Sequence, residues 1–170
     1  NSVAATTLYA HRSTFERDYS TGSAFDGRVD EYGINSKIGY GGEDFILIGS
    51  DYKSFEHLNQ LNRHYKDRSV FLTNSNLFGG RTVVTESIRR DLYDAFDNKT
   101  TGKIGVKHHL SEDMYLSANY GTAYNVPTLY QLYVPIYGNA ALKPENTRSY
   151  DATIGYRGLT VTYFSSRVDD

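Results

Sequence analysis

Acidic side chains gather around one turn-rich stretch near the start of the chain. This stretch covers residues 18–27, and Asp18, Asp26, Asp30 and Glu31 lie in it or just beyond it. Carboxylate oxygens at flexible spacing are ligands that Ca²⁺ accepts. Because the fixed spacing of a calcium-binding loop is absent, solvated loop acids are the favoured interpretation. A calcium site at Asp18, Asp26 and Asp30 is the alternative hypothesis.

No group of side chains predicts catalysis. His108 and His109 are adjacent on a predicted strand, so they point to opposite faces and cannot chelate one metal together. Serines are scattered over turns, and neither a Gly-x-Ser-x-Gly motif nor a glycine-rich phosphate loop occurs. We therefore predict that the chain is not an enzyme and has no cofactor other than a possible calcium ion.

Tyrosines are repeated in the stretch that holds all three prolines of the chain. The set consists of Tyr124, Tyr130, Tyr133 and Tyr137. Phenol rings could stack on a large planar or greasy ligand, with their hydroxyls orienting it. Packing of a long loop on itself, together with an interfacial aromatic girdle, is the favoured alternative. Ligand contact is thus a hypothesis for these four residues.

Composition separates this chain from ordinary soluble domains. It has 16 Tyr, 15 Gly and 8 Phe but one Met and no Trp, so aromatic and small residues replace the usual core formers. The net charge of -2 gives no basic field, so nucleic acid is not an expected partner. The absence of cysteine excludes disulfides and thiolate metal sites. No segment has the roughly 20 apolar residues of a membrane helix, but hydropathy does not detect membrane-spanning strands.

Alternating polarity predicts β-strands throughout. In residues 114–121, for example, Met114, Leu116, Ala118 and Tyr120 face one way and the residues between them face the other. We predict about nine strands, over residues 3–17, 28–40, 44–57, 68–78, 82–94, 103–110, 114–124, 148–156 and 159–170.

The connections between these strands alternate in length. Long connections are predicted at residues 18–27, 58–67, 95–101 and 125–148, and short ones at 41–43, 79–81, 111–113 and 158. This alternation is typical of an antiparallel meander in a transmembrane β-barrel, with short periplasmic turns and long extracellular loops. An odd number of strands cannot close a bacterial barrel, so we expect part of a larger one.

Charged residues fall on the predicted lumen side of the strands. They are Asp51, Lys53, Arg89, Asp91, Lys103 and Lys107. They could line a ligand path or contact a plug, but any large barrel has a polar lumen. Structural pairing among them is the favoured interpretation.

The second half of the chain resembles the late barrel strands of TonB-dependent outer-membrane receptors. An aromatic-glycine strand leads into VPTL at residues 126–129, and NAALKPE at 139–145 and SYD at 149–151 follow. From residue 87, SIRRDLYDAFDNKTTGKIG adds a strand with Arg and Asp before a Lys-Thr turn. The cobalamin-transporting branch is the most similar.

This resemblance implies a barrel of about 22 strands, of which residues 1–170 would supply less than half. It also implies a plug domain and C-terminal strands that are absent from this sequence. The expected protein lies in the bacterial outer membrane and imports a scarce large nutrient, either cobalamin or a ferric siderophore or haem. The energy would come from TonB through the plug, and receptors of the cobalamin branch also bind calcium.

Two other function classes fit the strand pattern alone. One is a passive porin or structural outer-membrane barrel, and the other is a soluble β-sheet adhesion or binding protein. The TonB-dependent receptor is favoured because the motifs after residue 120 accompany the alternation of connection lengths.

Overall fold

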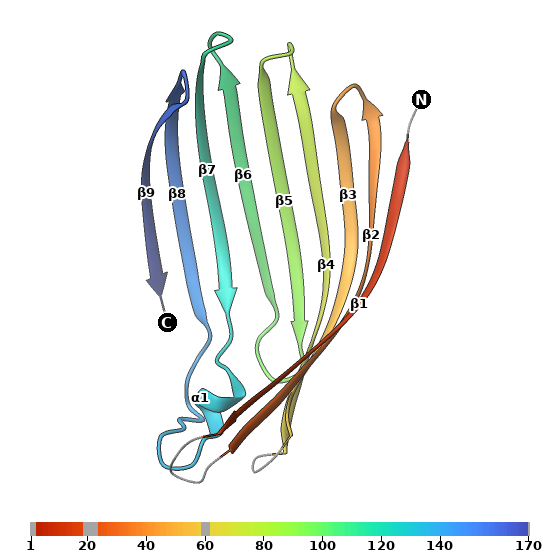
Figure 1. Cartoon of the computed structure of the whole chain (residues 1–170), viewed down its shortest axis with the longest axis vertical. Helices are drawn as coiled ribbons and strands as arrows, with labels where there is room; N and C mark the ends of the chain where they lie inside the picture. Colours follow the sequence, from red (N-terminus) through yellow and green to blue (C-terminus); the bar gives the residue numbers. More distant parts are fainter. Residues whose placement is uncertain (1–2, 19–23, 59–61, 170) are drawn as a thin grey trace.

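The computed structural model describes residues 3–18, 24–58 and 62–169, which form one nine-stranded antiparallel sheet. Neighbours in sequence are neighbours in the sheet, so the predicted all-β meander is confirmed (Figure 1). The strands are β1 (Ala4–Asp18), β2 (Ala24–Gly41), β3 (Asp44–His57), β4 (Arg63–Phe78), β5 (Thr82–Tyr93), β6 (Lys99–His109), β7 (Met114–Asn125), β8 (Glu145–Tyr156) and β9 (Leu159–Asp169). A short helix, α1 (Leu129–Tyr133), lies between β7 and β8. Among the described residues, no helix has the length and apolar character needed to span a membrane.

The register of the pairing separates two chemically distinct faces. Residues directly opposite each other in an antiparallel pair point to the same side of the sheet. One face, called the polar face below, contains the paired series Tyr9, Gly33, Asp51, Ser69 and Asp91. The other, called the apolar face, contains most of the large aliphatic side chains of the strands.

Burial on these faces is the reverse of that in a soluble protein. On the apolar face, Ile34, Ile48, Val106 and Ile154 are 45%, 49%, 39% and 42% exposed. On the polar face, Asp67 and Ser69 are only 4% and 1% exposed. A soluble sandwich would hide the aliphatic residues in its centre. This distribution instead suits a barrel wall whose outer surface contacts hydrocarbon.

Aromatic side chains border the apolar face at two levels. Nearer the α1 end are Tyr32, Tyr52, Tyr120, Tyr150 and Tyr163, and nearer the opposite end are Tyr40, Phe78 and Tyr156. Tyr32 and Tyr40 are eight residues apart in β2, which corresponds to roughly 27 Å along a strand. This spacing matches an apolar band about 25 Å tall between two aromatic girdles, given strand tilt.

Several strands begin earlier than the sequence predicts. β2, β4 and β6 start at Ala24, Arg63 and Lys99, whereas the alternation of polarity indicates starts at 28, 68 and 103. The predicted long connections at 18–27, 58–67 and 95–101 are therefore partly strand, although residues 19–23 and 59–61 lie outside the described part. The physical reason is that both sides of a strand are wet beyond the lipid. Alternation then disappears while backbone pairing continues.

The longest connection folds back over the polar face. It covers residues 126–144 and contains α1, which contacts β3 although it follows β7. In Figure 1, α1 lies beside the lower ends of β1 and β2, at the edge opposite the short turns. A loop from β7 can contact β3 only because the sheet curves, so the polar face is the inner wall of the curve.

Placing a charge on the outer wall tests the assignment of the two faces. Ala118 lies on the apolar face, opposite Val106 and Ala152, about midway between the levels of Tyr150 and Tyr156. We expect Ala118→Lys to destabilise the complete receptor by about 2–4 kcal/mol in lipid bilayers. The matched variant is Asn119→Lys on the polar face, where the new ammonium can pair with Asp151, as Asn119 does now at 2.8 Å. Unfolding by guanidinium measures both, and equal losses would show that the faces are wrongly assigned.

Candidate functional site

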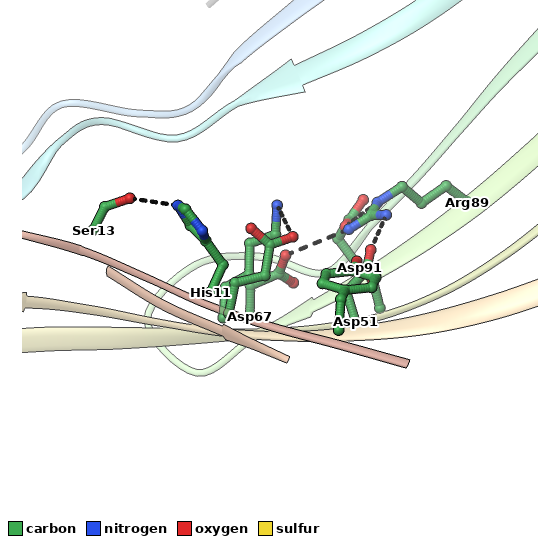
Figure 2. A network of polar contacts seen from close by, with 10 residues as sticks. His11, Ser13, Asp51, Asp67, Arg89 and Asp91 are labelled. Atoms are coloured by element: carbon green, nitrogen blue, oxygen red, sulfur yellow. Dashed lines mark hydrogen bonds and ion pairs between the residues drawn. The ribbon is translucent and has the colours of Figure 1, made fainter. Parts of the chain in front are cut away.

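A network of carboxylates around one arginine crosses the polar face at the middle of the sheet. Arg89 on β5 donates from Nη1 to Oδ2 of Asp51 at 2.8 Å and from Nε to Oδ1 of Asp91 at 2.7 Å. Its Nη2 lies 3.9 Å from Oδ2 of Asp67. The Tyr9 hydroxyl from β1 donates to Asp51 Oδ1. Figure 2 shows the guanidinium directed between the carboxylates of neighbouring strands.

The charges of this network do not balance locally. Asp51, Asp67 and Asp91 are 7%, 4% and 7% exposed, and they share the single guanidinium of Arg89. Within the described residues, Oδ1 of Asp67 is buried with no hydrogen-bond partner. A buried oxygen without a donor is costly, so this part of the inner wall favours a further donor or cation.

The structure places all six predicted lumen residues on the polar face but joins only three of them. Asp51, Arg89 and Asp91 belong to the network, whereas Lys53 pairs with Glu31 at 3.1 Å. Lys103 and Lys107 are exposed, and the Lys107 ammonium lies 4.2 Å from the ring centre of Tyr115. Asp51, Lys53, Arg89 and Asp91 are thus ion-paired, whereas the two lysines of β6 remain available to the lumen.

Sequence reasoning missed Tyr9 and Asp67 as members of the network. Asp67 falls where a loop was expected, and Tyr9 lies 42 positions before Asp51. Only the register of β1 to β4 brings them together. Alternating polarity gave no signal here, because Arg68 lies on the apolar face and Phe71 on the polar face.

An aromatic cluster lines the same face nearer to α1. Tyr65 stacks on Phe55 with ring centres 4.6 Å apart and meets Phe96 edge-on at 5.2 Å. Tyr93 contacts Phe96 at 5.9 Å and Tyr124 at 5.9 Å. The cluster joins β3, β4, β5 and β7 where the strands leave the lipid level.

A hollow of about 610 Å³ lies between this cluster and α1. Its walls include Phe15, Val29, Phe55 and Tyr65 from the strands, and Thr128, Leu129 and Tyr130 from the loop. Leu129 and Leu132 are 8% and 5% exposed, so the helix is anchored by its apolar side. The lining also includes the ionisable residues Glu16, Arg28, Glu56 and His57. Apolar walls with a small number of polar groups are the usual character of a ligand pocket.

The local sequence explains why a helix forms inside this loop. Thr128 accepts a hydrogen bond from the Gln131 backbone N–H at 3.2 Å, and Gln131 Oε1 accepts from the Thr128 backbone N–H at 2.9 Å. This reciprocal capping box fixes the first turn. The pattern Thr-x-x-Gln was visible in the sequence, so the helix, which was not predicted, had a detectable signal.

The four candidate tyrosines have four different environments. Tyr124 packs in the aromatic cluster and donates to the Asp97 carbonyl at 3.3 Å. Tyr130 lines the hollow, and the ring of Tyr133 lies 4.8 Å from the Arg63 guanidinium. Tyr137 is 84% exposed, next to Ile136, which is 92% exposed with a φ of 78°. The tyrosines therefore do not form one cluster, and only Tyr130 lies in the hollow.

The predicted calcium ligands do not converge on one point. Asp30 is ion-paired with Arg12 and Arg28, and lies four residues from Asp26 on β2, or roughly 13 Å along the strand. Asp18 is exposed at the end of β1. No group of three or more acidic or histidine side chains fit for a metal occurs within residues 3–18, 24–58 and 62–169. Calcium at this end of the sheet stays a prediction.

The adjacent histidines lie on opposite faces. His108 Nδ1 is 2.7 Å from the Thr82 hydroxyl, and the His109 ring lies 5.9 Å from the Tyr115 ring. Each histidine therefore contacts a different neighbour on a different face of the sheet.

These features define a section of a transmembrane β-barrel wall, with a charged inner face, a lipid-facing outer face and a loop folded toward the interior. A model of the family "TonB dependent receptor-like, beta-barrel" matches residues 1–170. The chain belongs to this family, which places it in the bacterial outer membrane among receptors and transporters that are not enzymes.

Curated relatives include vitamin B12 transporters. The chain is 31% identical over 87 residues to "Vitamin B12 transporter BtuB" of Photobacterium profundum, an alignment that covers 49% of this chain and 14% of that protein. It is 28% identical over 111 residues to the protein of the same name from Vibrio vulnificus, covering 65% of this chain and 17% of the relative. The chain thus spans only a small part of the length of these relatives.

Solved structures show the same fold at low sequence identity. The siderophore receptor PirA from Acinetobacter baumannii has a TM-score of 0.76 at 13% identity, covering 99% of this chain and 32% of that one. PirA from Pseudomonas aeruginosa has a TM-score of 0.71 at 15% identity, with 98% and 40% covered. At this identity the likeness establishes the barrel fold alone.

The carboxylate network predicts a large effect at one residue. Arg89→Met leaves three buried carboxylates without their shared cation. Because the Arg89 side chain is 30% exposed, we expect a loss of roughly 2 kcal/mol, below the 3–5 kcal/mol typical of fully buried pairs. Lys107→Met on the same face is the control and should cost less than about 1 kcal/mol. Guanidinium unfolding of the complete receptor in detergent measures both, and an Arg89→Met variant as stable as the control would show that the network does not stabilise the barrel.

Proposed function

We propose that this chain is the barrel wall of a receptor that captures a scarce, large nutrient outside the cell and admits it with energy delivered by TonB. The observation that carries the proposal is the loop between β7 and β8, which folds onto the inner wall and makes an aromatic hollow with it. The membership of the TonB-dependent receptor family supports energised uptake over passive diffusion.

The outer edges of β1 and β9 also support a larger assembly. Both strands lie at the margins of the sheet. In hydrocarbon, an unpaired strand edge leaves backbone groups without partners, so further strands of the same receptor would pair there. A plug domain inside the completed barrel would meet the polar face, and the unpaired oxygen of Asp67 and the lysines at 103 and 107 are groups that it would contact.

Cobalamin is the nutrient that we favour. Curated relatives that are 31% and 36% identical to this chain over the aligned residues are named vitamin B12 transporters, whereas the siderophore receptors resemble it in fold alone. A corrin ring is large and flat, which suits stacking against phenol rings with hydroxyls nearby. A ferric siderophore or haem is the alternative cargo.

Direct binding to the complete receptor tests the cargo and the residues together. We expect cyanocobalamin to bind, and the double variant Tyr130→Ala, Tyr137→Ala to bind about tenfold more weakly, since stacking on an aromatic ring contributes about 0.5–1.5 kcal/mol per contact. The control is Tyr163→Ala, which removes a tyrosine from the apolar face. Calorimetry gives the affinities. Unchanged affinity in the double variant would remove these tyrosines from the ligand site, and binding of a ferric siderophore in place of cyanocobalamin would replace the proposed cargo.

Tyr124 and Tyr133 are expected to act differently from the other two tyrosines. Their rings already pack on Tyr93 and on the Arg63 guanidinium. We therefore expect Tyr124→Ala to lower the thermal stability of the long-loop end more than it lowers ligand affinity.

Calcium at Asp18, Asp26 and Asp30 belongs to the same proposal, and thermal unfolding with and without a chelator would detect it. An unchanged unfolding temperature would exclude a calcium ion that stabilises this end of the sheet.

A further inference from the structure

A second concavity, called the lumen pocket below, lies on the polar face farther from α1 than the aromatic hollow. It has a volume of about 360 Å³, and its walls include Tyr9, Phe71, Ser87, Arg89, Thr101 and Lys103. On β4, Phe71 follows Tyr65, a wall residue of the aromatic hollow, by six positions. The two concavities are therefore roughly 20 Å apart along the strand. A molecule that moves inward from the hollow along this wall reaches the lumen pocket next.

Lys103 brings a positive charge into the lumen pocket. Its side chain is exposed, and within the described residues no carboxylate forms an ion pair with it. Arg89 differs, because Asp51, Asp67 and Asp91 share its guanidinium. Hydrogen bonds to Asp51 and Asp91 use two of the five N–H groups of Arg89, so further donors accompany the Lys103 ammonium.

The acceptors in the lumen pocket are already engaged. Asp51 lines the pocket, but its two oxygens accept hydrogen bonds from Tyr9 and Arg89. The hydroxyls of Thr73 and Ser87 pair with each other across β4 and β5 at 2.9 Å. The pocket therefore offers a ligand more hydrogen-bond donors than acceptors. A ligand group rich in acceptors and negative in charge, such as a phosphate or carboxylate, suits it.

The sheet opens beside Lys103. The paired register of β6 and β7 ends at Lys103 and Gly121, although both strands continue for four more residues toward α1. Next to this point the Thr122 hydroxyl accepts a hydrogen bond from the Gly102 backbone N–H at 3.0 Å, in the place of a backbone carbonyl. Gly102 and Thr122 both line the lumen pocket. The pocket therefore extends into the opening, which gives a bound group room beside the Lys103 ammonium.

We propose that the lumen pocket is a second subsite, which holds a phosphate or carboxylate group of the nutrient while the nutrient crosses the barrel. The Lys103 ammonium and the remaining donors of Arg89 contact the oxygens of this group, and Phe71 contacts the adjoining apolar framework. The inference rests on the proposed function and adds a transit step to it. A carboxylate of the receptor segment that fills the barrel at rest is the other source of the same chemistry, and the experiment separates the two.

Import of two corrinoids by cells that carry the complete receptor tests the lumen pocket. Cyanocobalamin has a phosphodiester, and dicyanocobinamide has the same ring without it. We expect Lys103→Met to slow cyanocobalamin import about tenfold, the low end for a lost hydrogen bond to a charged group, and to leave dicyanocobinamide import unchanged. Binding of cyanocobalamin to the receptor in de-energised cells should also be unchanged, because the aromatic hollow is intact.

Two matched variants accompany this measurement. Lys103→Arg keeps the positive charge and should recover most of the lost import. Lys107→Met removes the other exposed lysine of β6, which lies outside the lumen pocket, and should import both corrinoids at the native rate.

Unchanged cyanocobalamin import in Lys103→Met would overturn the proposal. Equal slowing of both corrinoids would overturn it as well, and a lower unfolding temperature of the same variant would then assign Lys103 to a carboxylate of the receptor itself.

A native receptor that binds neither corrinoid would contradict the proposed cargo and not the lumen pocket. The pocket is then tested with two ferric siderophores of opposite charge, an anionic tricatecholate complex and cationic ferrioxamine B. Lys103→Met should slow import of the anionic complex alone. Equal effects of the substitution on the two complexes would overturn the proposal.

Discussion

The need to pair every backbone N–H and C=O group inside the membrane governs this structure. Hydrocarbon offers no hydrogen-bond partner, so a spanning strand must find all of its partners in its two neighbours. The described residues form a single continuous meander, in which β2 to β8 each pair with both neighbours and β1 and β9 each pair on one side. Once the pairing is fixed, the face of the sheet to which each side chain points is fixed as well. The two faces can then be given opposite chemistry without any compact core.

Because the fold does not depend on a compact core, the inner wall can carry buried charged side chains. Three carboxylates are buried side by side at Asp51, Asp67 and Asp91 around the partly exposed guanidinium of Arg89, in a protein whose described residues form almost no conventional core. Such a network would be costly in the centre of a small soluble domain. In a barrel it faces an aqueous interior, where solvent and a neighbouring domain can complete it. The outer wall has the reverse arrangement, because its apolar residues remain exposed until lipid covers them.

The sequence predicted the fold more fully than it predicted the contacts. Alternation with a period of two identified nine strands, and glycines at 79 and 80, with φ values of 57° and 66°, marked a tight turn. The starts of β2, β4 and β6 were wrong because wet strand ends carry polar residues on both sides. The partners of Asp51 could not be predicted, since Tyr9, Ser69 and Arg89 come from three other strands, and only the register determines which residues meet. The face on which the six predicted lumen residues lie could be predicted from the alternation of side chains along each strand. The contacts of the network could be predicted only from the pairing register between strands.

The loop between β7 and β8 combines a buried base with an exposed tip. Leu129 and Leu132 are buried against the inner wall, and the capping box at Thr128 fixes the direction in which the chain enters α1. Beyond Pro135 the chain is exposed, and Ile136, a β-branched residue, adopts a positive φ that such residues rarely accept. Strain at an exposed apolar tip persists only where the surrounding chain holds it in place. The anchored helix provides that support, so Tyr137 extends into solvent from a fixed base, whereas Tyr130 lines the hollow.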